Sequence, residues 1–282
     1  MRLSAAFCLA CVTVLTSACS DTAQPCQPGQ QPAATRTPAD RLVGQVARAH
    51  SHNDYLQPRP LLDALDAGVA SVEVDVWLVG TTLRVGHWPW ELQGTLQEMY
   101  LDVLQARVDA TGSVLGDGRP FVLWVDIKER NPAYVNILRD VLAGYPMLSV
   151  FHPNRVEARA VTVVLSGDAF IKTQVVTSPD PVHATRDSNT YDPDDPPADP
   201  RWAFYALNYG DVVGWDGNGD VPPDTARTLA CYMENARLDA RPVRFYEVPE
   251  NPAVWELLIA HGAAFIGTDH PATMAATLRN TP

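Results

Sequence analysis

Basic residues are scarce in this chain of 282 residues. Lysine and arginine together number 21, whereas aspartate and glutamate number 33, which gives a formal net charge of −12. A net field of this sign repels the phosphates of nucleic acids and the headgroups of anionic lipids. We therefore expect no nucleic-acid partner. A protein this acidic that acts on a phosphate needs a local cation, which indicates a metal ion.

A long hydrophobic run is also missing. The apolar stretch from Ala5 to Leu15 follows a single arginine, Arg2, and it is shorter than the roughly 20 residues that span a bilayer. Residues 1–19 are therefore predicted to be a signal peptide, so the protein is expected to be exported. Because "LTSAC" resembles a bacterial lipoprotein box, Cys19 is a candidate for lipidation and attachment to the cell envelope, with plain secretion as the alternative.

Cysteine is rare, with five residues, of which Cys8 and Cys11 lie in the predicted signal peptide. If Cys19 carries a lipid, Cys26 and Cys231 remain. A disulfide between these two is compatible with an oxidising compartment. Cys231 itself, in "TLACYMENA", is expected to be a buried helical cysteine rather than a nucleophile.

A tether followed by one folded domain is the organisation that the remaining sequence favours. Residues 20–41 are rich in Pro, Gln, Ala and Thr without an apolar period, which predicts a flexible linker. Residues 42–282 alternate short β-rich runs with helical patterns, several of which begin near a proline and end at a glycine. Repeated units of this kind predict an α/β fold, and over this length they favour a (β/α)8 barrel similar to a TIM barrel.

Seven segments are predicted to be strands: "VARAH", "SVEVDVWL", "FVLWVDIK", "VTVVL", "WAFYAL", "VRFYEV" and "AAFIGT". Each is rich in β-branched or aromatic residues. Residues 178–201 are rich in proline and aspartate, and they are predicted to form a long surface loop.

Polar side chains gather at the ends of the predicted strands, where the reacting groups of barrel enzymes lie. Glu73 and Asp75 are two residues apart, so both project from the same face of one strand, where paired carboxylates resist burial unless a cation neutralises them. Asp126 and Lys128 share a face near the end of a later strand. Together with Asn53, these carboxylates offer oxygen ligands that suit Ca²⁺ or Mg²⁺ better than zinc.

Three histidines accompany these acids and are then free for proton transfer. His50 and His52 lie in "AHSHNDYL" after the first predicted strand, and His87 lies in "RVGHWPW". The alternative is that each polar residue is a separate, hydrogen-bonded structural group. That alternative requires an independent explanation at every strand end.

Several segments resemble the phosphatidylinositol-specific phospholipase C-like phosphodiesterases. "SHNDYL" is similar to the "SHNTYL" opening of the phospholipase C catalytic X region, "SVEVDVW" to its "VELDCW", and "VGH" to its second histidine segment. "WVDIKE" resembles a strand of glycerophosphodiester phosphodiesterases and sphingomyelinase D proteins. The order of "HNDY", "RPLLDAL", "SVEVDVWL", "WDGNGDVP", "VRFYEVPENPAVWELL" and "GTDHP" most resembles the branch that includes the altered-inheritance-of-mitochondria proteins.

The resemblance implies a phospholipase C-like barrel and a metal-dependent phosphodiesterase. The expected substrate is a glycerophosphodiester or a phospholipid-type phosphodiester, cleaved by acid–base catalysis with His52 and His87 through a cyclic phosphate. Lys128 is expected to contact the phosphate. The ligands that the resemblance implies for one divalent cation, Ca²⁺ or Mg²⁺, are Asn53, Glu73, Asp75 and Asp126. The residues assigned to substrate binding are His50, Tyr246 and Trp215.

Departures from the resemblance leave alternatives open. The "HRG" and "PENT" elements of the glycerophosphodiesterases are absent, and Trp88 follows His87 where those enzymes carry aspartate. His50 aligns with the "AHRG" histidine, so either His50 or His52 is the proton acceptor. Asp269 is expected to cap a helix rather than to line the site. The other function considered is a surface-anchored module that binds a phosphodiester or phosphoinositide without turning it over. A monomer is expected in either case.

Overall fold

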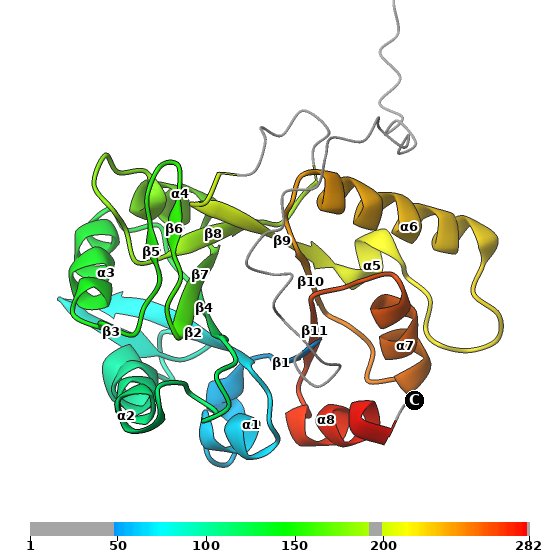
Figure 1. Cartoon of the computed structure of the whole chain (residues 1–282), viewed down its shortest axis with the longest axis horizontal. Coiled ribbons are helices and arrows are strands. Elements are labelled where there is room, and N and C mark those ends of the chain that lie inside the picture. Colours follow the sequence, from blue (N-terminus) through cyan, green and yellow to red (C-terminus); the bar gives the residue numbers. More distant parts are fainter. Residues whose placement is uncertain (1–47, 192–198, 281–282) are drawn as a thin grey trace, which may run out of the picture.

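Eight parallel strands close into a barrel in the computed structural model, which describes residues 48–191 and 199–280 (Figure 1). Closure is complete because β1 pairs with β11 on one side and with β2 on the other. The barrel strands are β1 (Ala49–Ser51), β2 (Ser71–Val79), β4 (Phe121–Ile127), β7 (Val161–Gly167), β8 (Thr185–Ser188), β9 (Trp202–Asn208), β10 (Val243–Tyr246) and β11 (Phe265–Thr268). The predicted (β/α)8 fold is confirmed.

Helices cover the outside of the barrel. They are α1 (Leu62–Asp66), α2 (Asp102–Thr111), α3 (Ala133–Ala143), α4 (Ala169–Val176), α5 (Tyr209–Val212), α6 (Pro223–Leu238), α7 (Pro252–Ala260) and α8 (Pro271–Asn280). Proline in the first turn of α6 and α7 fits the missing N–H at that position. No helix within the described ranges is long and apolar enough to cross a membrane.

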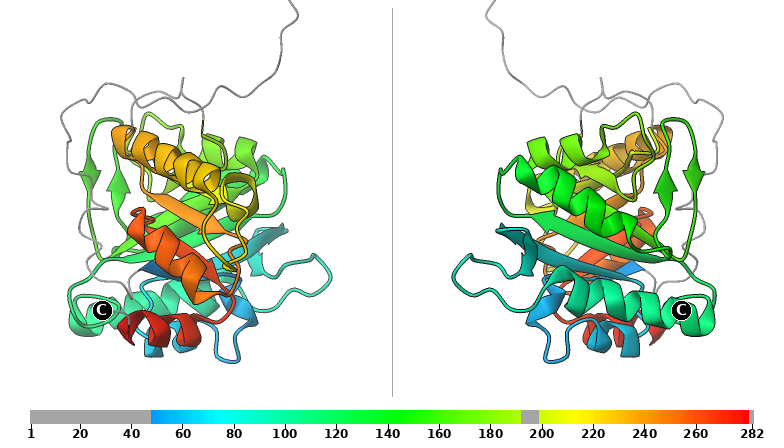
Figure 2. Two further views of the ribbon diagram at one scale, coloured as in Figure 1. Left: turned by 90° about the vertical axis from the view of Figure 1, so that its right-hand side faces the viewer. Right: turned by 90° about the vertical axis from the view of Figure 1, so that its left-hand side faces the viewer.

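The chain also forms short elements outside the barrel strands and the main helices. A 3-10 turn, η3 (Asp54–Leu56), and a π-helical turn, η4 (Gln97–Leu101), precede α1 and α2. Strand β3 (Thr82–Val85) runs antiparallel to β2, and β5 (Val150–Phe151) pairs with β6 (Val156–Glu157). In both views of Figure 2 the connection between β3 and η4 extends away from the rest of the molecule.

Successive side chains of each barrel strand point alternately outward and inward. This alternation gives one apolar cluster outside the barrel, a second inside it, and polar side chains toward one end of the interior. Outward-facing residues such as Val72, Val74 and Val76 join the main core beneath the helices. A second cluster contains Val122, Trp124, Val164, Phe204, Ala206 and Phe265. These side chains come from strands on different sides of the barrel, so they can meet only inside it. Polar residues on the same inward faces follow toward the carboxyl ends of the strands.

One sequence prediction is wrong. Residues 178–201 were expected to form a surface loop throughout, but Thr185–Ser188 is the barrel strand β8. The sequence does not show this strand, because the buried positions of β8 carry Thr185 and Asp187 rather than apolar residues. A polar strand of four residues gives no hydrophobic alternation to detect.

The predicted signal peptide, residues 1–19, and the predicted linker, residues 20–41, lie outside the described residues. Cys231 lies on α6, is half-buried and is disulfide-bonded. Cys26, the partner considered from the sequence, lies outside the described residues.

Candidate functional site

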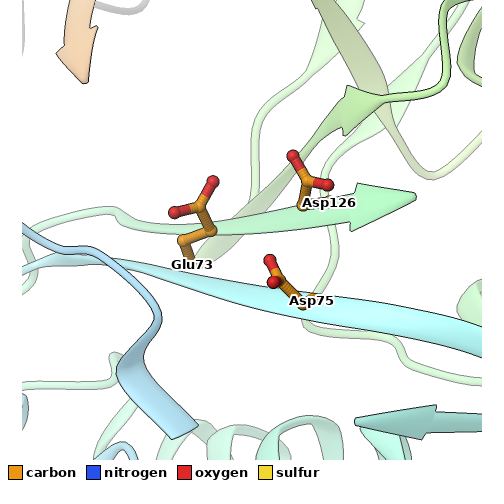
Figure 3. Close-up of side chains that lie close together, drawn as sticks. All are labelled: Glu73, Asp75 and Asp126. Atoms are coloured by element: carbon orange, nitrogen blue, oxygen red, sulfur yellow. The ribbon is translucent and has the colours of Figure 1, made fainter. Parts of the chain in front are cut away.

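Three carboxylates meet at the carboxyl ends of β2 and β4. Asp75 and Asp126 are register partners on these neighbouring strands, and Glu73 precedes Asp75 by two residues on the same face. One oxygen from each lies within 4.8 Å of the others, and Figure 3 shows the three side chains gathered in one space. Hard oxygen donors at this spacing suit a divalent cation. In addition, Glu73 Oε2 is buried and makes no hydrogen bond within the described residues.

Two basic side chains lie against these acids. The Nζ of Lys128 is 2.9 Å from Asp75 Oδ2 and 3.2 Å from Asp126 Oδ1. The Nη2 of Arg244, which comes from β10, is 2.7 Å from Glu73 Oε1. Each carboxylate of the cluster therefore has a basic partner.

The basic partners and burial act in opposite directions on the pKa values of the site. Burial raises the pKa of Asp75 despite the attraction of Lys128. Burial would also raise the pKa of Glu73, but Arg244 and the nearby histidines outweigh it and lower that pKa to about 2. For Lys128 burial lowers the pKa, yet Asp126 and Asp75 outweigh it, so the net pKa is raised. The lysine and Glu73 are therefore charged at neutral pH.

His52 and His87 each have a carboxylate next to Nδ1. His52 Nδ1 lies 2.8 Å from Asp269 Oδ1, and His87 Nδ1 lies 2.9 Å from Asp75 Oδ2. Both side chains are partly exposed, by 34% and 39%. A carboxylate on Nδ1 orients each ring, so Nε2 is the nitrogen available for proton transfer. The Nε2 of His52 lies 3.5 Å from Glu73 Oε2, at the edge of the acidic cluster.

His50 lies in a different environment. It is fully buried, its Nδ1 is 2.9 Å from Ser71 Oγ, and its ring packs edge-on against Trp124. Burial lowers the pKa of His50 well below its ordinary value, helped by the positive charge of Arg244. We therefore assign His50 to the interior that supports the site rather than to contact with a substrate.

The turn after β1 is built around a left-handed residue. Asn53 adopts φ 45° and ψ 46°, which its short polar side chain tolerates. The hydroxyl of Tyr55 donates to Asp75 Oδ2 at 2.9 Å and to Asn53 Oδ1 at 3.2 Å, so it links the predicted amide ligand to the cluster. Asp54 points elsewhere, since its buried carboxylate accepts hydrogen bonds from Ser51, Tyr100 and the backbone of the turn. It organises the turn rather than the site.

The role predicted for Asp269 from the sequence is wrong. It was expected to cap a helix, but its carboxylate contacts His52 instead. Glu250 holds this segment by accepting from the Asp269 backbone N–H and from the Thr268 hydroxyl. Proximity of β11 to β1 places Asp269 beside His52, and a sequence without known strand order does not reveal that.

Tyr246 and Trp215 are the remaining residues predicted to bind substrate. Tyr246 ends β10, is half-buried and packs against the apolar cluster inside the barrel. Trp215 lies between α5 and α6, and its indole N–H donates to the carbonyl of Asn218 within the same loop. Their predicted role in substrate binding stays a prediction.

A second buried ion pair was missed. The chain contains two lysines, and both enter the barrel. Lys172, from α4, donates to Asp187 Oδ1 at 2.5 Å and to Asn189 Oδ1 at 2.9 Å. Arg244 was also missed, although it precedes Tyr246 by two residues on β10 and therefore shares its inward face.

Comparison with known proteins gives these residues a context. Residues 41–116, which include both site histidines, Glu73 and Asp75, match the family model of the AIM6-like phosphodiesterase domain. Over this segment the chain is similar to these phosphodiesterases. The resemblance predicted from the sequence, down to the altered-inheritance-of-mitochondria branch, is confirmed.

Three fungal relatives are informative. Altered inheritance of mitochondria protein 6 of Eremothecium gossypii is 54% identical over 71 residues, which cover 24% of this chain and 18% of that protein. The protein of the same description from Lachancea thermotolerans is 32% identical over 154 residues, covering 45% of this chain and 35% of that protein. A homolog from Arthroderma benhamiae is 27% identical over 281 residues, covering 83% and 86%. The matches thus span much less than two thirds of the first two relatives.

A solved structure agrees with the fold. The crystal structure of glycerophosphodiester phosphodiesterase from Agrobacterium tumefaciens superposes with a TM-score of 0.51 at 14% sequence identity, covering 82% of this chain and 99% of that one. At this identity the likeness concerns the barrel alone.

Proposed function

We propose that the protein is a metal-dependent phosphodiesterase that cleaves a glycerophosphodiester or a phospholipid-type phosphodiester. The observation that carries the proposal is the pair His52 and His87, each held through Nδ1 by a carboxylate and each next to a member of the acidic cluster. The relation to the AIM6-like phosphodiesterase domain supports the reaction class.

Each of the two histidines carries out one of the two proton transfers of the reaction. His52 accepts the proton of a substrate hydroxyl that attacks phosphorus, and Asp269 stabilises the imidazolium that results. His87 donates a proton to the oxygen that leaves, and Asp75 fixes its ring for that transfer. If the attacking hydroxyl is next to the phosphate, the first product is a cyclic phosphate. Lys128 holds a phosphate oxygen and stabilises charge there.

The acidic cluster would hold the cation. Glu73, Asp75 and Asp126 supply carboxylate oxygens, and the Asn53 amide oxygen is a fourth donor. A bound Ca²⁺ or Mg²⁺ supplies Lewis-acid stabilisation of negative charge on the phosphate. The oxygen ligands suit either ion.

Charge balance supports a phosphodiester substrate. The ion pairs in and around the cluster combine four carboxylates with three basic side chains, namely Glu73, Asp75, Asp126, Asp187, Lys128, Lys172 and Arg244. When all are ionised, the group carries one negative charge in excess. A divalent cation changes this excess to one positive charge, which complements the single negative charge of a phosphodiester.

Exposed apolar side chains favour the lipid-type substrate. Six large hydrophobic residues are exposed within the described ranges: Leu56, Leu62, Val79, Trp88, Trp90 and Phe170. Leu56, Leu62 and Phe170 lie in segments that follow the carboxyl ends of β1 and β7, Val79 is the last residue of β2, and Trp88 and Trp90 follow β3 beside His87. Trp88 packs edge-on against His87 and stacks on Trp90. Aromatic side chains are well suited to an interface between water and lipid.

Export and a monomeric state are part of the same proposal. Export rests on the N-terminal sequence, with either lipidation of Cys19 or plain secretion. Phosphorus NMR tests the reaction: the mature protein is mixed with glycerophosphocholine, phosphatidylinositol or lysophosphatidylcholine and with Ca²⁺ or Mg²⁺. A new phosphorus resonance identifies the substrate class and any cyclic phosphate. Binding of these diesters by calorimetry without any new resonance would instead support the binding-module alternative.

A further inference from the structure

The Arg244–Glu73 ion pair crosses the interior of the barrel. The two residues are 171 positions apart, and β1 and β11 separate their strands in the barrel. Arg244 Nη2 lies 2.7 Å from Glu73 Oε1, and both side chains are at least 95% buried. A buried pair of this kind is costly to form from water, so its presence beside the acidic cluster calls for an explanation.

Trp124 fixes the guanidinium in place. The Arg244 guanidinium lies 4.6 Å from the centre of the Trp124 ring, and Trp124 is the register partner of Glu73 on β4. Nε and Nη1 of Arg244 are buried and make no hydrogen bond within the described residues. Glu73 is therefore the acid that Arg244 contacts, through Oε1. The other oxygen, Oε2, lies 3.5 Å from His52 Nε2 and 4.0 Å from His50 Nε2.

We infer that Arg244 is a built-in counter-charge of the cation site: it neutralises and orients Glu73, so that the barrel folds before a cation binds. The inference rests on the proposed function, because it takes the acidic cluster to be a cation site. Lys128 does the same for Asp75 and Asp126. Arg244 is thus a positioning residue, and it acts on the reaction through Glu73.

A cation should replace the missing charge when Arg244 is removed. In Arg244→Met the buried Glu73 carboxylate loses the arginine 2.7 Å away and keeps only the two histidines at 3.5 and 4.0 Å, and breaking such a buried pair is strongly destabilising. A divalent cation bound at Oε2 compensates the same carboxylate. The variant should therefore depend on the cation for stability, whereas the natural protein should depend on it much less.

Arg241 provides the matched control. It is also a buried arginine on a tryptophan, with its guanidinium 3.8 Å from the centre of the Trp202 ring, and it bonds to the Trp202 carbonyl and the Tyr205 hydroxyl. These partners lie outside the acidic cluster. Arg241→Met should lower the melting temperature equally with and without cation.

The experiment measures melting temperature in EDTA and in millimolar Ca²⁺ or Mg²⁺, with calorimetry of cation binding to the natural protein. For Arg244→Met we expect a fall on the order of 10 °C in EDTA, most of which the cation restores. Arg244→Lys keeps a charge and should show a smaller fall and less rescue. The double variant Glu73→Gln, Arg244→Met removes both charges and should recover in EDTA without responding to cation.

The outcomes are distinct. If calorimetry detects cation binding to the natural protein but Arg244→Met loses stability equally in EDTA and in cation, the counter-charge role is overturned and the cation site stands. If neither protein binds Ca²⁺ or Mg²⁺, the counter-charge role and the metal dependence of the proposed function both fail. An Arg244→Met protein that does not fold in EDTA but folds in cation supports the role.

Discussion

Asp269 Oδ1 lies 2.8 Å from His52 Nδ1 and thereby connects the last strand of the barrel to the first. The residues are 217 positions apart, but β1 and β11 are adjacent in the barrel, so both side chains leave the same edge. Asp269 orients the ring of His52 through Nδ1, as Asp75 orients the ring of His87. Two histidines oriented in the same way are the basis of the predictions that follow.

Asp269→Asn should lower kcat by about 10- to 100-fold with little change in KM. The asparagine removes the charge that stabilises the His52 imidazolium, which forms after substrate binds, but it keeps the side-chain shape. The loss should be smaller than the about 10²- to 10⁴-fold contribution of a complete acid–base group. Steady-state kinetics would check this, with the exposed Asp211→Asn as the control. An unchanged kcat would show that Asp269 does not support catalysis.

His52→Ala and His87→Ala should each lower the rate by about 10²- to 10⁴-fold, because each removes one of the two proton transfers. His261→Ala, at the end of α7 outside the barrel, should retain full activity. Single-turnover assays on the NMR-identified substrate measure the effect. Full activity in either site variant removes that histidine from the mechanism.

Chelation should abolish activity, and added divalent cation should restore it. Asp126→Asn should weaken cation binding by more than the about 10- to 100-fold typical of outer-shell changes. Ser166→Ala is the matched outer-shell variant, since the Ser166 hydroxyl donates to Asp126 Oδ2 at 3.0 Å, and its effect should fall within that range. Calorimetric titration distinguishes the two. Equal affinities for both variants would exclude Asp126 as a ligand.

His50 should make the fold sensitive to mild acid. Burial lowers its pKa well below the ordinary 6.5, so below pH 6.5 the unfolded chain binds a proton that the folded protein does not. The stabilisation is complete above pH 6.5 and is lost as the pH falls, by up to about 1.4 kcal/mol per pH unit. Urea unfolding from pH 7.5 to 5.5 measures this slope. His50→Asn should flatten the slope and exposed His270→Asn should not, whereas an identical slope in His50→Asn would contradict the assignment.

Trp90→Ala should separate lipid from soluble substrates. Trp90 is 76% exposed and stacks on Trp88 beside His87. If this pair enters a lipid surface, the variant should lose about tenfold in kcat/KM on lysophosphatidylcholine carried in phosphatidylcholine vesicles. Neutral lipid is the appropriate probe because the net charge of −12 disfavours an anionic surface. The soluble glycerophosphodiester serves as the internal control, and an equal loss on both substrates would argue against a role at the lipid surface.

Much of the site could be predicted because strands have a short and regular period. Glu73 and Asp75 share a face by sequence spacing alone, and the βα alternation indicates that their end of the strand meets those of Asp126 and Lys128. The same period should have identified Arg244, two residues before Tyr246. It failed for β8, where a buried ion pair at Asp187 replaces the apolar residues on which strand prediction depends.

The sequence by itself determined the fold class, the histidines and the acidic residues, since these follow from local periodicity and from the order of motifs. Only the tertiary structure decided which partners meet. Closure of the barrel brings Asp269 to His52 and Arg244 to Glu73, and burial separates His50 from His52. Contacts between residues this far apart in the chain depend on strand order and on the depth of each side chain in the barrel, and neither quantity is encoded in local spacing.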